Sequence, residues 1–183
     1  MRQSFDLFFV SSNHHKFQEA RKILDSFGIS LRFFKYDLEE IQSNSLKKIA
    51  SKKAEQAFQK CKKPIIVEDD GLFIDSLAGF PGPYSSYVFK TIGNEGILQL
   101  VEQNRMAKFV SIISFCDTKN SKSFEATIDG NISKIQHGKG WGYDPIFIPA
   151  NSNKTFAQLT NKNELSHRYK ALKKFSSWYL NNL

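Results

Sequence analysis

The sequence has few cysteines and no long hydrophobic run. Its 183 residues include only two cysteines, Cys61 and Cys116, and these show no metal-ligand spacing. Two isolated cysteines argue against a disulfide scaffold or a cysteine-based zinc site and favour reduced thiols. The apolar stretch near the N-terminus spans only a few residues, which is too short for a signal peptide or a membrane span. We therefore expect a cytoplasmic protein that does not associate with membranes.

Acidic residues are scarcer than basic ones, 18 against 26, which gives a net charge of +8. This surplus suits nucleic acid, acidic membranes or small polyanions, although a hydrated basic surface explains most of the lysines. Aromatic residues are plentiful, because phenylalanine alone occurs 17 times. Such a composition predicts a core built on large rings. Since neither a repeat nor a linker is visible, residues 1–183 are predicted to form a single domain.

The hydrophobic pattern predicts strands that alternate with helices. The first half of the chain is predicted to form a strand over 5–10, a helix that Asn13 caps and Gly28 ends, a strand over 30–36, a helix over 46–62 and a short strand over 65–67. The second half is predicted to form a short helix over 94–104, strands over 107–116, 122–132 and 146–148, and a final helix over 166–180. A chain that opens with a β-α-β unit belongs to the α/β class.

Three adjacent carboxylates, Glu68, Asp69 and Asp70, directly follow the predicted strand over 65–67. In open α/β sheets, ligands bind at the carboxyl ends of the strands. Carboxylates suit Mg²⁺, which prefers carboxylate and phosphate oxygens, and one of them can instead activate a water molecule. An acidic, hydrated strand end is the simpler alternative. Glu40, near the end of the preceding strand, completes a metal site if the two strands are neighbours.

The segment from Ser11 to Lys16 lies between the first strand and the first helix. Its hydroxyls, amide and lysine can bind phosphate at the positive end of a helix, although plain helix capping explains the segment better when it is taken alone. The segment lacks the glycines of a P-loop. His14 and His15 are a poor metal pair, because adjacent side chains on a helix point about 100° apart.

A third group of residues combines aromatic and charged side chains near the C-terminus. Trp141 and Tyr143 can each stack on a nucleobase, a contact worth roughly 1–3 kcal/mol, and His167 and Arg168 can donate to a carbonyl oxygen. Taken singly, the two aromatics are also explained by core packing, and Arg168 by a surface ion pair. Together with carboxylates suited to a metal, this group points to an enzyme that acts on a nucleotide.

Five motifs, in order along nearly the whole chain, resemble the inosine triphosphate pyrophosphatase family. They are Ser11-Ser12-Asn13-His14-His15-Lys16, Leu38-Glu39-Glu40-Ile41-Gln42, Glu68-Asp69-Asp70-Gly71-Leu72 with Gly79 to Ser85, Gly140 to Pro145, and Lys162 with Ser166-His167-Arg168. The resemblance implies an elongated mixed β-sheet with flanking helices, arranged as two lobes around a central cleft, usually in a homodimer. It also implies Mg²⁺-dependent hydrolysis of ITP, dITP and XTP to the monophosphate and pyrophosphate.

The resemblance also implies a role for each matching residue. Asp69 would activate water, and the metal ligands would be Asp69 and Glu40, with Glu68 as an additional candidate. The substrate-binding residues would be Ser11, Ser12, Asn13, His14, His15, Lys16, Lys53, Asp70, Trp141, Gly142, Tyr143, Asp144, Lys162, His167 and Arg168. Lys53 and the first segment would hold the polyphosphate, and the C-terminal residues would surround the base and sugar.

Four positions depart from the family pattern, and one of them is Lys48, where the second helix usually carries a glutamate. Ser12 replaces a glycine, Asp70 replaces a serine or threonine, and Ser86 replaces a basic residue. These departures keep open a nucleotide-binding protein with weak or altered turnover. A nucleic-acid-binding module is the third possibility, suggested by the net charge. Carboxylates beside the base-reading residues argue against it, because they would repel a continuous phosphate backbone.

Overall fold

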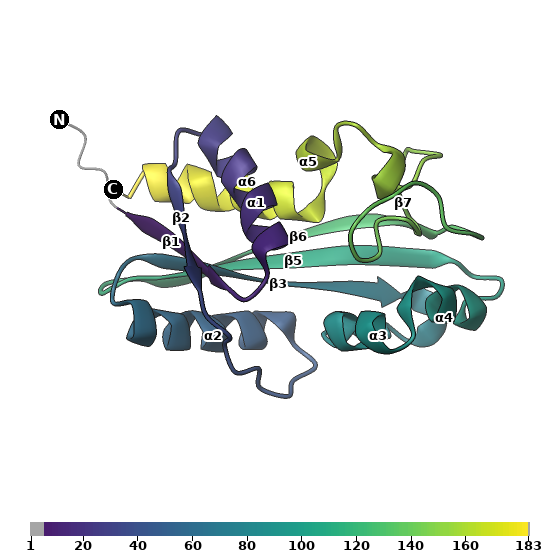
Figure 1. Cartoon of the computed structure of the whole chain (residues 1–183), viewed down its shortest axis with the longest axis horizontal. Helices are drawn as coiled ribbons and strands as arrows, with labels where there is room; N and C mark the ends of the chain where they lie inside the picture. The colour runs from purple at the N-terminus through teal and green to yellow at the C-terminus, as the bar shows by residue number, and fades with distance from the viewer. Residues whose placement is uncertain (1–5, 183) are drawn as a thin grey trace. The chain divides into compact units, whose positions relative to one another are not determined.

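The computed structural model describes residues 6–182, and these form two compact units (Figure 1). Unit 1 comprises residues 6–69, 111–126 and 168–182, and unit 2 comprises residues 70–110 and 127–167. Hydrogen bonds join the strands in the order β2-β1-β3-β5-β6-β7, with β4 paired to β3. Both parallel and antiparallel pairs occur, so the predicted mixed α/β class is confirmed.

Unit 1 begins with the predicted β-α-β unit. It contains β1 (Leu7–Ser11), α1 (His14–Ser26), β2 (Leu31–Lys35) and α2 (Leu46–Cys61). It also contains the first part of β3 (Ile65–Ile74), the later part of β5 (Met106–Cys116), the early part of β6 (Ser121–Ile132) and most of α6 (His167–Leu180). β1 pairs in parallel with both β2 and β3 and therefore lies between them. Phe5, the first residue of the predicted strand, lies outside the described residues.

The predicted helix ends of unit 1 are borne out in detail. The Asn13 side chain accepts hydrogen bonds from the backbone amides of His15 and Lys16, at 3.0 and 3.3 Å, and so caps α1. Gly28 follows the helix with a φ angle of +75°, a conformation that glycine adopts without a steric penalty. Ser45 caps α2 through a 3.3 Å bond from the amide of Lys48.

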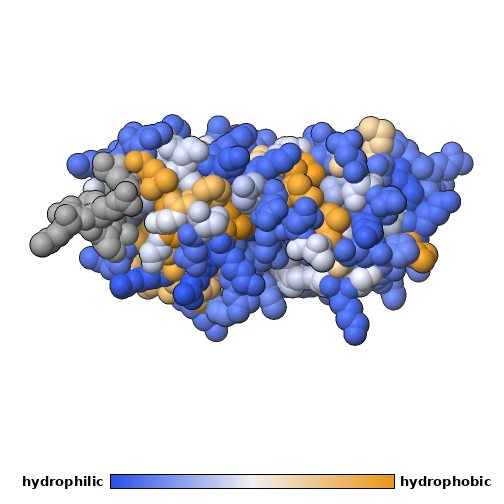
Figure 2. All heavy atoms as spheres, turned by 90° about the horizontal axis from the view of Figure 1, so that it is seen from above, coloured by the Kyte–Doolittle hydropathy of each residue, from blue (hydrophilic) through white to orange (hydrophobic). Residues whose placement is uncertain are grey.

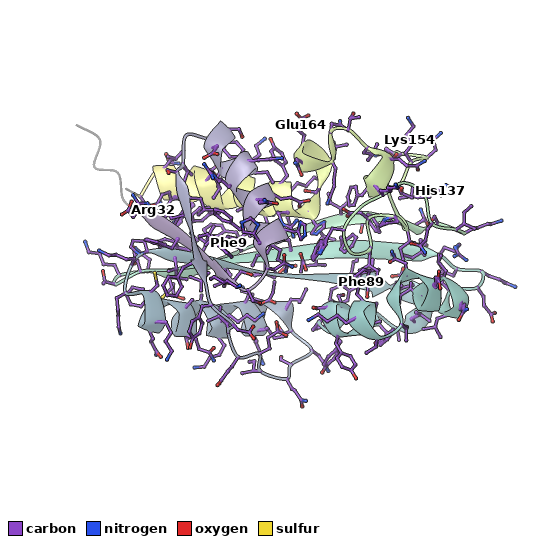
Figure 3. The ribbon with its side chains drawn as sticks, viewed as in Figure 1. Phe9, Arg32, Phe89, His137, Lys154 and Glu164 are labelled. Carbon is purple, nitrogen blue, oxygen red and sulfur yellow. The ribbon has the colours of Figure 1, made fainter. Side chains whose placement is uncertain are left out.

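The central strands of unit 1, β1 and β3, are buried on both faces. Figure 1 draws α2 on one side of these strands and α1 and α6 on the other. The α1 and α6 side holds a large cluster that includes Phe9, labelled in Figure 3, together with Ile66 and Phe175. The α2 side holds a smaller cluster that includes Val10 and Val67. Because successive strand residues point to opposite faces, neighbouring residues of β3 face different helices.

β3 is longer than the sequence predicts, because it continues through the three carboxylates to Ile74. The prediction that Glu68, Asp69 and Asp70 follow the end of the strand is therefore wrong. Acidic residues are depleted in strands, so the pattern appeared to stop at Val67. Burial explains the extension, because Leu72 and Ile74 are fully buried and continue the strand into unit 2.

Unit 2 contains the rest of β3, β5 and β6, together with several short elements. These are β4 (Pro81–Gly82), α3 (Ser85–Thr91), α4 (Gly93–Leu100), β7 (Phe147–Pro149), the 3-10 turns Asp75–Leu77 and Phe156–Gln158, and α5 (Lys162–Leu165). The sequence did not indicate α3, and α4 ends earlier than predicted. The core of unit 2 is rich in phenylalanine rings, with Phe109, Phe147 and Phe156 buried together. Phe89, labelled in Figure 3, packs on it from α3.

The surface and the cysteines agree with the composition. No helix within residues 6–182 is long and apolar enough to cross a bilayer. Hydrophilic residues cover most of the face drawn in Figure 2, where apolar residues form limited groups. Cys61 is half-buried and Cys116 is buried, and both are free thiols, as predicted.

Candidate functional site

Asp69 is the centre of the charged residues on the α2 face of unit 1. Its Oδ1 accepts a 2.8 Å hydrogen bond from Nζ of Lys53, which comes from α2. The same ammonium contacts a carboxylate oxygen of Glu40, from the segment after β2. The strand that precedes Glu40 is not a neighbour of β3, because β1 lies between them. The condition that the two strands are neighbours is therefore not met, yet Glu40 and Asp69 both contact the ammonium of Lys53.

Burial dominates the electrostatics of Asp69. The pKa of its carboxyl is raised above the usual range because the group has lost most of its hydration. The positive charges of Lys53 and Lys16 lower this pKa, and the negative charge of Glu40 raises it again, but burial prevails. A carboxylate with a raised pKa is a stronger base than an ordinary aspartate, which suits proton abstraction.

Asp69 also retains coordinating capacity. Its Oδ2 is buried and meets no hydrogen-bond donor within residues 6–182. A buried carboxylate oxygen without a donor is costly unless a cation or water binds it, so Asp69 fits a metal ion. Glu40 adds a second carboxylate whose side chain is 57% exposed and therefore accessible. Residues 6–182 contain no group of three or more potential ligands, so such an ion would also need phosphate or water oxygens.

A small polar cavity of about 50 Å³ lies beside these residues. Its lining comes from β1, the segment after β2, α2 and β3, and consists of Val10, Ser11, Ser12, Tyr36, Asp37, Leu38, Glu40, Lys53, Val67 and Glu68. In this cavity, Ser11 and Ser12 of the predicted phosphate-binding segment lie beside Lys53 and beside Glu40, a candidate metal ligand. All of these residues belong to unit 1.

Side chains of the predicted phosphate-binding segment accept hydrogen bonds from its own backbone and so stabilise the turn before α1. Ser11 Oγ accepts a 3.0 Å bond from the amide of Asn13, and Asn13 caps α1. Positive φ angles among the described non-glycine residues occur only at Lys62, Ala78 and Asn151, so Ser12 replaces the family glycine without backbone strain. His14 and His15 are both exposed, and the ring of His14 lies 5.8 and 5.4 Å from those of Phe17 and Phe33, centroid to centroid.

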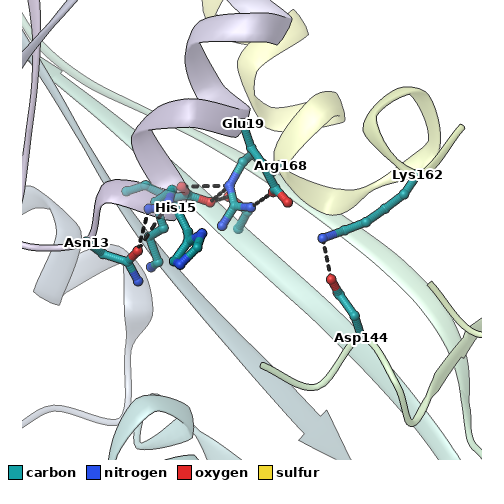
Figure 4. Close-up of polar contacts among 9 residues, drawn as sticks. Asn13, His15, Glu19, Asp144, Lys162 and Arg168 are labelled. Carbon is teal, nitrogen blue, oxygen red and sulfur yellow. Dashed lines mark hydrogen bonds and ion pairs between the residues drawn. The ribbon is translucent and has the colours of Figure 1, made fainter. Parts of the chain in front are cut away.

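Glu68 points to the opposite face from Asp69. Both of its oxygens lie 2.8 Å from Nε of Arg168, and one also accepts a 3.1 Å bond from Ser111. Arg168 further contacts Glu19 of α1 (Figure 4). The Glu68 side chain is fully buried and that of Arg168 is 3% exposed. This geometry favours Glu68 as the buried anchor of Arg168 over the additional metal role considered from the sequence.

The predicted base-binding residues of unit 2 differ in exposure. Tyr143 is buried in the core and its hydroxyl donates a 2.8 Å bond to the carbonyl of Ser85. Burial raises the pKa of this hydroxyl, so Tyr143 stays a neutral donor. Trp141 is 38% exposed, so its ring is the accessible one. Tyr143 therefore agrees with the core-packing alternative. Trp141 is the more exposed of the two rings and is the better candidate for stacking on a base.

The segment that carries Trp141 is tied down by polar contacts. Nδ2 of the buried Asn94 donates to the carbonyl of Gly142 at 3.1 Å. Gly142 has a φ angle of +62°, which explains the need for glycine after the tryptophan. Asp144 and Lys162 form a 2.6 Å ion pair between two mostly buried side chains, which Figure 4 also shows. The charges of these two predicted substrate-binding residues therefore balance each other.

His167 and Asp70 complete the predicted residues of unit 2. His167 is buried against the face of Phe109, and Asp70 is half-buried in β3. Ser86 is exposed on α3. Sequence reasoning did not select Glu19, Asn94 or Phe109. A carboxylate beside the buried stripe of an amphipathic helix was a weak signal for Glu19, and nothing in the local pattern marked Asn94.

Comparisons with known proteins agree with the five motifs. The sequence model of the Ham1 family matches residues 7–178. The chain is 46% identical over 181 residues to the dITP/XTP pyrophosphatase of Methanopyrus kandleri, with 96% of each chain covered. It is also 46% identical over 182 residues to the dITP/XTP pyrophosphatase of Pyrococcus horikoshii, with 97% of this chain and 98% of the relative covered. The solved Ham1 protein of Staphylococcus aureus is similar in structure, with a TM-score of 0.77, 27% identity, and coverage of 96% of this chain and 100% of that one. From the family match and these relatives, the chain belongs to the Ham1 family.

Proposed function

We propose that this protein hydrolyses non-canonical purine nucleoside triphosphates, namely ITP, dITP and XTP, to the monophosphate and pyrophosphate. The curated relatives named as dITP/XTP pyrophosphatases match this chain over almost its whole length, which supports the reaction and its substrate class. The chain is therefore a hydrolase of nucleoside triphosphates that removes abnormal purines from the nucleotide pool. Residues 1–183 act as a single functional domain in this proposal.

The buried carboxylate of Asp69, with its raised pKa and its bond to Lys53, is the observation that carries the proposed chemistry. A water oxygen attacks the α-phosphorus while the water proton passes to Asp69. The bond from that phosphorus to the oxygen bridging to the β-phosphorus then breaks, and pyrophosphate leaves with the electron pair. Lys53 and Lys16 balance the negative charge of the polyphosphate, assisted by Ser11, Ser12 and Asn13.

Mg²⁺ is the proposed metal, with Asp69 and Glu40 as its protein ligands. The donor-free Oδ2 of Asp69 and the exposed carboxylate of Glu40 support this assignment. When bound, the ion would neutralise charge on the phosphate oxygens. In our proposal, Lys53 then keeps its bond to Asp69 or turns toward phosphate, because its ammonium can rotate among three donors.

The base is proposed to contact the residues near the C-terminus, with Trp141 stacking on its face. Hypoxanthine and xanthine carry a carbonyl at position 6, which accepts hydrogen bonds from His167 and Arg168. Adenine carries an amino donor there and would leave donors facing donors, which costs binding energy. Asp144 and Lys162 complete the surroundings of the base and sugar. The ion pairs to Glu68 and Glu19 support a fixed guanidinium at Arg168.

We also propose a cytoplasmic homodimer. A nucleotide pool as substrate and two free thiols support the compartment. Several large apolar side chains within residues 80–92 are exposed, namely Phe80, Tyr84, Tyr87 and Ile92. They support a protein interface, because large exposed apolar patches are uncommon on monomers. A monomer at micromolar concentration in sedimentation equilibrium would contradict the dimer.

Pyrophosphate release tests the proposed function directly. The protein is incubated with ITP, dITP, XTP, GTP and ATP, with Mg²⁺ or with a chelator. We expect rapid release from the first three substrates, only with the metal. Asp69→Asn should lower the rate by at least about 100-fold, because the amide cannot accept the water proton. Asp25→Asn, which changes an exposed carboxylate of α1, is the matched control.

Tight ITP binding without pyrophosphate release in the parent protein would instead support the nucleotide-binding alternative. If the Asp69→Asn protein is folded and hydrolyses ITP as fast as the control, the role assigned to Asp69 is wrong.

A further inference from the structure

The ring of His167 lies flat on the ring of Phe109. Their centroids are 4.5 Å apart and their planes differ by 8°, so the two faces are in direct contact. Both side chains are more than nine-tenths buried, and both residues belong to unit 2.

A buried histidine needs such a contact if its ring is to aim a hydrogen bond. The torsion between the β-carbon and the imidazole joins an sp³ to an sp² carbon, and its energy profile is broad. The histidine backbone therefore leaves the direction of the ring N–H groups open. The flat ring of Phe109 restricts rotation about this torsion. Turning the imidazole out of the plane parallel to Phe109 would drive its atoms into the Phe109 ring.

Phe109 is itself held firmly. It lies on β5, where rigid strand geometry fixes its backbone. Its ring meets that of Phe147 edge-on, with 4.7 Å between the ring centroids, and stacks on that of Phe156, with 6.2 Å between the centroids. It also contacts Tyr143 at 6.5 Å, and Tyr143 lies two residues after Trp141. One ring thus supports both His167 and the segment proposed to hold the base.

We propose that Phe109 is a positioning residue that sets the plane of the His167 ring and thereby the selectivity for a purine with a carbonyl at position 6. This inference rests on the proposed function, in which His167 donates to that carbonyl. Phe109 touches no reacting atom in this proposal. It acts through His167, so its loss should reduce discrimination between bases more than it reduces the chemical step.

The test compares three variants by their kcat/KM for ITP and for ATP. Phe109→Leu removes the ring face, and Phe109→Tyr keeps it. Phe124→Leu is the matched control, because it removes a similarly buried ring in unit 1, where that ring contacts Phe175 and Trp178. We expect Phe109→Leu to lower the ratio of ITP to ATP by roughly tenfold, the effect of losing one well-aligned hydrogen bond. Phe109→Tyr should restore most of the ratio, and Phe124→Leu should leave it within about twofold of the parent.

The KM and kcat values separate positioning from a general loss of structure. For Phe109→Leu we expect the KM for ITP to rise with kcat largely kept, whereas unfolding lowers the active fraction for both nucleotides alike. An unchanged ratio in Phe109→Leu, or an equal fall in Phe124→Leu, would overturn the inference. If the parent protein releases no pyrophosphate from ITP, the proposed function fails instead, so the two failures are distinguishable.

Discussion

At the scale of single residues, Glu68 and Asp69 are chain neighbours with different surroundings. A strand turns successive side chains to opposite faces, so Glu68 meets Arg168 while Asp69 meets Lys53. The α2 face keeps a carboxylate oxygen without a donor within the described residues, whereas the α6 face neutralises its carboxylate completely. One of the two carboxylates is thus available for chemistry.

The acid limb of the pH profile should report the raised pKa of Asp69. The proposed mechanism needs the deprotonated carboxylate, so kcat/KM should fall as the pH drops through this pKa. Burial places that fall at a higher pH than an ordinary aspartate would. Lys53 lowers the pKa of Asp69, so Lys53→Met should move the acid limb to still higher pH. Lys53 is also assigned to phosphate binding, so the position of the limb, and not the rate, is the measurement.

Lys52→Met is the control for this shift. Lys52 is the preceding residue of α2, and its exposed ammonium pairs with Glu55 at 2.9 Å instead of with Asp69. The acid limb of the Lys52→Met protein should coincide with that of the parent protein. A Lys53→Met profile that coincides with the parent would show that another group controls the limb.

At the scale of elements, α6 connects unit 2 to the buried charges of unit 1. Its first residue, His167, belongs to unit 2, and its second, Arg168, pairs with Glu68 and Glu19. A buried charge that loses its partner is strongly destabilising, whereas an exposed pair contributes little. The start of α6 therefore depends on charge as well as on packing.

Arg168→Met should lower the free energy of unfolding by about 3–5 kcal/mol, because the buried side chain of Glu68 would lose its charge partner and, among the described residues, keep a bond from Ser111 alone. Adding Glu68→Gln should recover part of this loss, since it removes the unpaired charge. Urea denaturation measures both values. Arg21→Met, which breaks an exposed pair with Asp25, should cost less than about 1 kcal/mol. Equal losses for Arg168→Met and Arg21→Met would contradict the buried ion pair.

The sequence predicted elements well where pattern and capping agreed, and poorly where function interrupted the pattern. Asn13 and Gly28 bracket α1 as expected, because each residue type fits its terminal conformation. β3 was cut short, because carboxylates in the middle of a buried strand contradict local propensity. α3 carries buried Ser85 and Val88 among exposed residues, which is too weak a stripe for its seven residues to indicate a helix.

At the scale of the whole molecule, the proposed roles divide between the units. Unit 1 contains Asp69, Lys53 and Glu40, and unit 2 contains Trp141 and His167. The five motifs could be identified from the sequence, because their chemistry is visible there, and the roles assigned to their residues stay predictions. The supports of those residues, such as the ring of Phe109 under His167, could not be predicted, since they come from distant segments that only the fold brings together.

The central claim is that water attacks the α-phosphorus and that pyrophosphate is the leaving group. Hydrolysis of ITP in water enriched in ¹⁸O, followed by mass spectrometry of the products, tests it most directly. The account predicts one ¹⁸O atom in the monophosphate and unlabelled pyrophosphate. Label in the pyrophosphate, or a nucleoside diphosphate with labelled phosphate, would contradict it.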